Sequence, residues 1–386
     1  MKTPIYMDHH ATTPVDERVV AVMLPYFTEI FGNAASTDHS FGAAALRAVD
    51  GAREETAKII GARPEEIIFT SGATESDNLA ILGAVEAYSD RGDHVITCVT
   101  EHKAVLDTCE YLEASGRNVT YLPVDSMGLV DLDALRSAIT PKTVLISIMA
   151  ANNEIGVLAP LKEIGEIARE HEVLFHTDAT QAVGHVPVDM NEMNIDLLSL
   201  SGHKIYGPKG VGALYVRSRR PYVKLAEQIH GGGHERGMRS GTTNVAGVVG
   251  LGAALNIART EMVGEATRLA ELRDQLWQGL QAGIDNVELN GHPTKRLPHN
   301  LSCAIPGVES QALLVQLKDD VALSTGSACT TAKVEPSHVI MALGYDEARA
   351  HSSLRFGLGR SSLMEEVLHT VEQTTAAVQK IGLMTP

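Results

Sequence analysis

Seven short apolar runs recur between residues 66 and 216, and this alternation most constrains the fold. The runs cover residues 66–70, 94–99, 119–124, 143–150, 173–176, 195–200 and 211–216. Stretches with helical spacing, such as 74–88, 103–114 and 161–171, separate several of them. Strands that alternate with helices build a parallel sheet covered on both faces, whose strands are apolar almost throughout. The pattern therefore predicts an α/β domain with a mainly parallel seven-stranded sheet wrapped by helices.

The pattern changes after about residue 260. Five apolar residues recur there at helical spacing, namely Leu269, Leu272, Leu276, Leu280 and Ile284. This spacing predicts one long amphipathic helix. Shorter strand-like pieces follow, and a last helix is expected over about 362–379. The C-terminal part is therefore predicted to form a second, smaller α+β domain.

Charge and cysteine content exclude several classes of function. The chain has 32 basic and 48 acidic residues, a net charge of −16, which argues against direct nucleic-acid binding. Its four cysteines form no CxxC pair, so neither a zinc site nor a disulfide framework is indicated. We see no signal peptide and no apolar run of membrane-spanning length. We therefore expect a cytoplasmic protein without a membrane partner or a bound metal.

Three features follow predicted strands, and ligands bind at the carboxyl ends of strands in open α/β sheets. Residues 71–76 (SGATES) form a small, hydroxyl-rich turn that opens a helix, which suits a phosphate or serves as a plain N-cap. Asp178 could cap a helix, bind a metal or pair with a cationic ring nitrogen. Lys204 is either a surface lysine or a Schiff-base amine. Together, the turn, the acid and the lysine are the parts that a pyridoxal phosphate site requires.

Other side chains could complete such a site. Cys329 lies among small and polar residues (STGSACTT), which predicts an accessible loop where a thiolate could act as nucleophile. His102 follows another predicted strand, where a structural and a catalytic role are about equally favoured. Arg355 could hold a substrate carboxylate or form a surface ion pair. The other cysteines, Cys98, Cys109 and Cys303, lie in apolar or helical surroundings typical of packing.

A glycine-rich stretch over 230–243 has neither helical nor strand spacing. Its basic residues Arg236 and Arg239 favour a nearby anion. The stretch is therefore interpreted either as a second anion cradle or as a solvated loop.

Ten motifs in order identify a family. They are YMDHHATTP (6–14), FGNAAS (31–36), TSGATESDN (70–78), TEHKAVLDTC (100–109), NNEIG (152–156), HTDATQAVG (176–184), SGHKIYGPKG (201–210), GGGHERGMRSGT (231–242), GSACT (326–330) and SSLRFGLGR (352–360). With these motifs the chain resembles the cysteine desulfurases of the NifS/IscS type, which belong to the class-V, fold-type-I pyridoxal phosphate enzymes. The resemblance covers essentially the whole length. It implies a large domain of residues 15–260 and a small domain of 1–14 and 261–386, with the cysteine loop over about 322–335.

The resemblance also implies roles for individual residues. Lys204 would carry the cofactor as a Schiff base and Cys329 would accept sulfur, while His102 would stack on the ring and move protons. The remaining cofactor contacts would come from Ala73, Thr74, Asn153, Asp178, Gln181, Ser201 and His203, with Thr242 reaching in from a partner subunit. Asn33 and Arg355, with Asn153 nearby, would hold the substrate.

The implied reaction is the removal of sulfur from L-cysteine, which gives L-alanine and a persulfide on Cys329. A homodimer, an iron–sulfur scaffold protein and other sulfur acceptors, with tRNA thiolation as one destination, are the implied partners. Cys329 could transiently ligate a 2Fe–2S cluster together with the scaffold. Alternatives are a selenocysteine lyase, a class-V aminotransferase, which would have no use for Cys329, and a non-catalytic sulfur-transfer scaffold.

Overall fold

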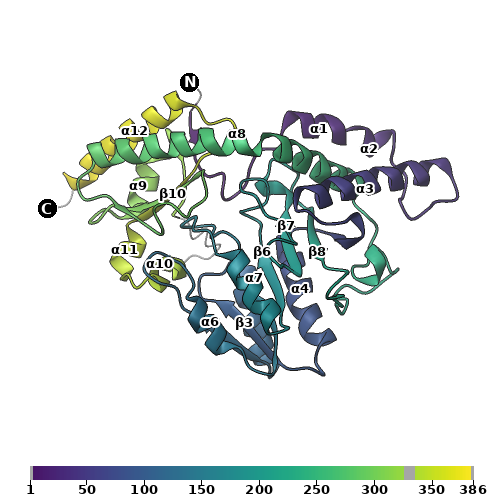
Figure 1. Cartoon of the computed structure of the whole chain (residues 1–386). Coiled ribbons are helices and arrows are strands. Elements are labelled where there is room, and N and C mark those ends of the chain that lie inside the picture. The colour runs from purple at the N-terminus through teal and green to yellow at the C-terminus, as the bar shows by residue number, and fades with distance from the viewer. Residues whose placement is uncertain (1–2, 326–334, 384–386) are drawn as a thin grey trace.

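One seven-stranded sheet forms the centre of the computed structural model, which describes residues 3–325 and 335–383 (Figure 1). In spatial order its strands are β2 (Ile67–Thr70), β8 (Gly212–Val216), β7 (Leu197–Ser201), β6 (Leu174–Asp178), β5 (Thr143–Ser147), β3 (His94–Cys98) and β4 (Asn118–Leu122). Strand β8 is antiparallel to β2 and β7, whereas the pairs from β7 through to β4 are parallel. Each predicted apolar run overlaps one of these strands. The predicted mainly parallel, seven-stranded α/β fold is thus confirmed.

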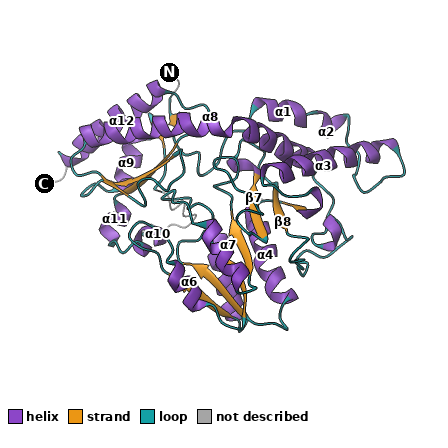
Figure 2. Cartoon of the chain, in the orientation of Figure 1, coloured by secondary structure: helices purple, strands orange, loops and turns teal. Residues whose placement is uncertain are grey.

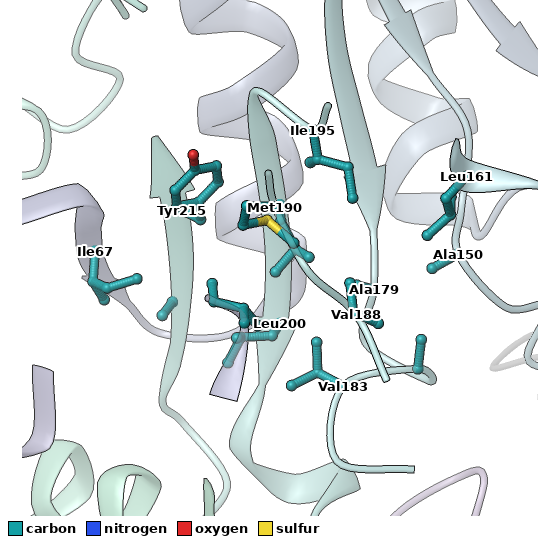
Figure 3. Close-up of a cluster of buried hydrophobic side chains, with 14 of the residues drawn as sticks. Ile67, Ala150, Leu161, Ala179, Val183, Val188, Met190, Ile195, Leu200 and Tyr215 are labelled. Atoms are coloured by element: carbon teal, nitrogen blue, oxygen red, sulfur yellow. The ribbon is translucent and has the colours of Figure 1, made fainter. Parts of the chain in front are cut away.

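Two helical layers cover the sheet, one on each face, and they bury most of its strands on both sides. On one face, α4 (Ala73–Ala87) and α5 (Lys103–Ala114) pack through apolar residues such as Leu79 and Val105. On the other face lie α3 (Ser40–Ile59), α7 (Leu161–Glu170) and the first half of α8 (Val245–Gly283). Figure 3 shows Ile67, Leu200 and Tyr215, from three different strands, in the cluster on this second face.

The long helix α8 joins two hydrophobic clusters. Its buried residues Leu251 and Leu255 belong to the cluster on the sheet, whereas Leu272 and Leu276 pack in another cluster. That cluster also contains residues of β10 (Asn300–Ala304), β12 (Ser353–Gly357), α9 (Ser310–Leu317) and α12 (Met364–Gly382). In Figure 1, α12 lies along this part of α8. The boundary predicted near residue 260 falls within this continuous helix, and the division into domains stays a prediction.

The start of the chain packs with its C-terminal part. Strand β1 (Ile5–Tyr6) pairs in parallel with β11 (Val321–Ala322), and Met7 is fully buried in the second cluster. A small antiparallel sheet there has the order β12, β10 and β9 (Glu288–Leu289). The remaining helices are α1 (Glu17–Met23), α2 (Pro25–Thr28), α6 (Leu132–Ala138), α10 (His338–Ala342) and α11 (Glu347–His351).

Sequence patterns did not predict α1, α2, α3 or the first half of α8. The buried face of α3 consists largely of Gly42, Ala45, Ala52 and Ala57, whose small side chains give a weak periodic signal. In Figure 2, α1, α2 and α3 lie beside the long helix α8. No helix among the described residues is both long enough and apolar enough to cross a membrane.

Candidate active site

A cavity of about 670 Å³ lies where the carboxyl ends of β2, β6 and β7 meet. This size is typical of a small-molecule or cofactor site. The cavity brings together the predicted site residues Ala73, Thr74, His102, Asn153, Asp178, Gln181, Ser201, His203, Lys204 and Arg355. Residues more than 280 positions apart in the sequence therefore line one space, as the strand-end rule led us to expect.

Three predicted residues are not placed in this cavity. Asn33 and Thr242 are exposed and are not among the described residues that line it. The Asn33 side chain instead accepts a hydrogen bond from the Ala35 backbone N–H at 3.0 Å. Thr242 lies just before α8, and its role toward a partner subunit stays a prediction. Cys329 lies outside the described residues, so its role rests on the sequence.

Lys204 follows β7 in a short 3₁₀ turn and faces the cavity. Its Nζ donates hydrogen bonds to the backbone carbonyls of His10 and Ala11, the latter at 2.8 Å. Burial and the nearby Arg355 lower the pKa of Lys204 to about 8. Because only the neutral amine is nucleophilic, this environment suits a lysine that forms a Schiff base.

Asp178 ends β6 and is 5% exposed, with Oδ1 accepting a hydrogen bond from the Thr180 N–H at 2.9 Å. Two more carboxyl groups, of Asp77 and Glu101, are fully buried nearby. Burial raises the pKa of both well above the usual range, and the charge of Asp178 adds to the effect. Burial therefore disfavours the charged form of Asp77 and Glu101, neither of which lines the cavity, whereas Asp178 does.

A buried histidine lies behind Asp178 on β6. Burial lowers the pKa of His176 to about 3, so its ring is neutral. Ring nitrogens Nδ1 and Nε2 contact the hydroxyls of Ser147 at 2.8 Å and Ser199 at 3.0 Å. His176 therefore adds no positive charge that would compete for Asp178.

The turn after β2 is built to receive an anion. Its N-cap residue, Gly72, has a φ of 153° and lacks a side chain that could accept from the first-turn N–H groups of α4. Ala73 and Thr74 of this turn line the cavity. A helix N-terminus with free N–H groups and a positive dipole end binds phosphate.

Neighbouring side chains reinforce this anion site. Lys209 and Ser201 line the same cavity, as does His203. Burial lowers the pKa of His203 to about 4, and its Nδ1 lies 3.1 Å from the Thr12 hydroxyl. A neutral imidazole has one N–H, and when the Thr12 hydroxyl donates to Nδ1, the proton on Nε2 can be donated to an anion.

The two arginines of the glycine-rich stretch pair with groups of the same chain and do not line the cavity. Arg239 donates from Nε to Glu75 Oε1 at 2.7 Å. Arg236 donates from Nη1 to the Ile67 carbonyl at 3.1 Å. Both guanidinium groups therefore bind protein oxygens, and one of them anchors the loop to the start of α4.

His102 and Arg355 face the cavity from opposite parts of the chain. His102 caps α5, with Nδ1 accepting a hydrogen bond from the Ala104 N–H at 3.1 Å, so Nε2 carries the proton. Arg355 is 2% exposed, and its Nη2 donates to Asp8 Oδ1 at 2.8 Å. Its Nη1 donates to the Asn153 carbonyl at 2.9 Å.

The residues that line the cavity fit pyridoxal phosphate. The cavity combines an amine of lowered pKa, a buried carboxylate and a helix N-terminus that can bind phosphate. These groups match the aldehyde, the basic ring nitrogen and the phosphate of this cofactor.

Comparisons with known proteins agree with this assignment. The Aminotransferase class-V model matches residues 5–369, so the chain belongs to the class-V aminotransferase family, whose enzymes depend on pyridoxal phosphate. The chain is 55% identical over 386 residues to the cysteine desulfurase IscS of Anaeromyxobacter sp. (strain Fw109-5), covering all of this chain and 95% of that one. Within the class-V family the chain is therefore a member of the cysteine desulfurases.

Solved structures give the same result. A NifS-like protein is similar with a TM-score of 0.91 and 36% identity, covering 98% of this chain and 100% of that chain. SspA in complex with cysteine is similar with a TM-score of 0.81 and 37% identity, covering 93% of this chain and 100% of that chain. The resemblance inferred from the ten motifs is thus confirmed.

Sequence reasoning missed several residues of the site. Asp8 and His10 were noted within the first motif without a role, yet Asp8 pairs with Arg355 and His10 contacts Gln181. His338 and Glu154 also line the cavity. Their partners are distant in sequence, so no local spacing pattern could have identified them.

Proposed function

We propose that this cysteine desulfurase removes sulfur from L-cysteine and produces L-alanine and a persulfide on Cys329. The observation that carries the proposal is Lys204, a buried amine with a pKa of about 8 in the same cavity as Asp178. When bound, pyridoxal phosphate supplies an electron sink that stabilises negative charge on the substrate Cα. The similarity to SspA, solved in complex with cysteine, supports cysteine as the substrate.

Each side chain then has a distinct task. Arg355 holds the substrate carboxylate, helped by Asn33 and Asn153. The neutral amine of Lys204 takes the Cα proton, and the Nε2 proton of His102 is available to the substrate. Asp178 would pair with the protonated ring nitrogen of the cofactor, and Gln181 would donate to its ring oxygen. The residues that would hold the phosphate are Ala73, Thr74, Ser201 and His203.

The Cys329 thiolate then attacks the sulfur of the bound cysteine. The new S–S bond forms as the substrate Cβ–S bond breaks, and the electron pair of the broken bond stays with the substrate. Cβ takes up a proton, Cα takes back the proton that Lys204 removed, and the product leaves as alanine. Burial raises the pKa of Cys98 to about 11 and that of Cys109 and Cys303 to about 12. These three thiols are buried and stay protonated, which favours Cys329 as the acceptor.

We also propose that the chain acts as a homodimer in a reducing cytoplasm. Apolar side chains are exposed along α1, α2 and the segment up to α3, namely Val20, Leu24, Phe27, Phe31 and Phe41. A second copy that covers this face would also bring Thr242 to its neighbour's cofactor. The persulfide would pass to an iron–sulfur scaffold and other acceptors, in line with the IscS name of the relatives.

A mixture of two inactive variants tests the shared site. Lys204→Ala disables its own site, and Thr242→Glu places a negative charge against the partner's phosphate. Mixed dimers would contain one intact site, so co-refolding should restore about a quarter of wild-type turnover. Absence of any recovery, although mixed dimers form, would contradict the role of Thr242.

Product balance tests the reaction itself. With L-cysteine and a reductant, wild type should release alanine and sulfide in equal amounts. Cys329→Ala should release neither, whereas the matched control Cys109→Ala should keep its turnover because that thiol is fully buried in α5. A protein that binds pyridoxal phosphate but forms no alanine would refute the proposed activity.

A further inference from the structure

We propose that a buried relay of hydrogen bonds, from Arg296 through Asn300 and His10 to Gln181, fixes which end of the Gln181 amide faces the cofactor cavity. The four side chains are called the His10 relay below. The inference rests on the proposed function in one respect, since it takes Gln181 to meet the cofactor ring oxygen. The relay makes His10, Asn300 and Arg296 positioning residues that act through Gln181.

Arg296 determines which groups donate and which accept hydrogen bonds along the His10 relay. A guanidinium group only donates hydrogen bonds, and Arg296 Nη2 lies 3.0 Å from the Asn300 side-chain oxygen Oδ1. The Asn300 amide nitrogen must therefore point the other way. It lies 3.2 Å from the Glu154 carbonyl, which accepts, and 3.1 Å from His10 Nε2.

This arrangement fixes the tautomer of His10. Because the Asn300 amide nitrogen donates, His10 Nε2 must accept and carries no proton. The proton of the neutral ring then sits on Nδ1, which lies 2.9 Å from Gln181 Oε1. Burial and the nearby Arg355 hold the pKa of His10 well below its usual range, which keeps the ring in this neutral form.

The last step orients Gln181. Its Oε1 is occupied by His10, and its Nε2 donates one hydrogen to the His10 carbonyl at 3.1 Å. The second hydrogen on Nε2 is left for the cavity that Gln181 lines. A cofactor ring oxygen placed there therefore meets the Nε2–H donor of Gln181. If the Gln181 amide were flipped, its Oε1 would face the ring oxygen instead and no hydrogen bond could form.

The surroundings hold the relay in place. Asn300 is fully buried and His10 is 1% exposed. The His10 ring stacks on His299 with centroids 4.4 Å apart. Gly156, with a φ of 73°, leaves the space that the Asn300 side chain fills, since an added Cβ would lie 2.4 Å from Asn300 Oδ1. The same His10 carbonyl that binds Gln181 also accepts from Lys204, so the relay touches two residues of the site.

The tautomer can be measured without any turnover. In the cofactor-loaded protein labelled with ¹⁵N-histidine, two-dimensional NMR of the ring nitrogens distinguishes a protonated Nδ1 from a protonated Nε2, and loss of signals in a His10 variant assigns the ring. The relay predicts a proton on Nδ1 and none on Nε2 from pH 6 to 9. A proton on Nε2, or on both nitrogens, overturns the relay.

A matched pair of variants tests the effect on the cofactor. In His10→Asn the amide nitrogen occupies the place of Nδ1 and can still donate to Gln181, whereas in His10→Gln the amide reaches only the place of Nε2. Both variants lose the stacking on His299. The donor from Gln181 stabilises negative charge on the ring oxygen, so its loss favours the protonated form.

The visible absorbance of the bound cofactor, followed against pH, reports this change. His10→Asn should titrate within a few tenths of a unit of wild type, and His10→Gln about one unit higher, the size of one hydrogen bond to a charged group. Equal shifts in both variants, or no shift in either, overturn the proposal. Neither readout involves cysteine, so failure of the desulfurase assignment would show separately in the product balance.

Discussion

Substitution of Gly156 by alanine is expected to destabilise the protein far more than its small volume suggests. Gly156 is buried and has a φ of 73°, a conformation that disfavours any residue with a Cβ. The added Cβ would lie 2.4 Å from both Cγ and Oδ1 of Asn300. Real contacts of this kind are never so short, so the Asn300 side chain must move.

The cost has two parts. The left-handed backbone costs alanine about 1 kcal/mol. Moving Asn300 breaks its hydrogen bonds to Arg296 and His10, and leaving such buried groups unsatisfied costs about 1–3 kcal/mol each. The total is about 3–7 kcal/mol, of which the backbone part is the minor one.

A control isolates the second part. Gly116 also has a positive φ, of 82°, but an added Cβ there would meet nothing within 4 Å. Gly116→Ala should therefore lose only about 1 kcal/mol. Urea unfolding of the cofactor-free variants, at one protein concentration, measures the difference in stability between them. About 2–6 kcal/mol corresponds to about 0.7–2 M in the unfolding midpoint for a slope near 3 kcal/mol per M. Equal midpoints for the two variants would refute the packing argument.

Two further predictions concern the cavity. Because the pKa of Lys204 is about 8 in the folded chain and 10.5 is its ordinary value, the unfolded state binds more protons between these pH values and stability rises with pH across that window. Lys204→Met should remove this rise from the cofactor-free protein, as urea midpoints at several pH values would show; an unchanged rise contradicts the assigned pKa. Arg355→Lys should raise the KM for cysteine about tenfold or more, because a lysine cannot bind a carboxylate through two parallel hydrogen bonds. Steady-state kinetics measure this, and an unchanged KM would argue that Arg355 serves contacts within the protein, such as its pair with Asp8, and not the substrate.

The sequence was sufficient for the sheet because buried parallel strands are apolar on both faces. All residues of β3, β5 and β7 are buried, so they stand out as runs without any partner being known. Helix α3 was not predicted because alanine and glycine fill most of its buried positions. The first half of helix α8 was not predicted because glycine and alanine, such as Gly247 and Gly250, are frequent in its first turns and give a weak helical pattern.

The residues of the site likewise fall into those that the sequence predicted and those that it did not. Asp178 and Lys204 were predicted because each directly follows a strand, and strand ends of one sheet meet. The roles of Asp8 and His10 were not predicted, because their partners are distant in the sequence. Asp8 lies 347 positions from Arg355, and His10 lies 171 positions from Gln181. Contacts at such separations depend on how β1 and β11 bring the chain start onto the C-terminal part. No local spacing encodes that packing.

The most direct test of the central claim is the site of sulfur addition. The protein is exposed to a few equivalents of L-cysteine without a reductant, its thiols are then blocked, and its peptides are analysed by mass spectrometry. We predict one added sulfur atom on the peptide that contains Cys329, with alanine formed in equal amount. Sulfur found on Cys98, Cys109 or Cys303, or alanine formed without any added sulfur, would contradict the account.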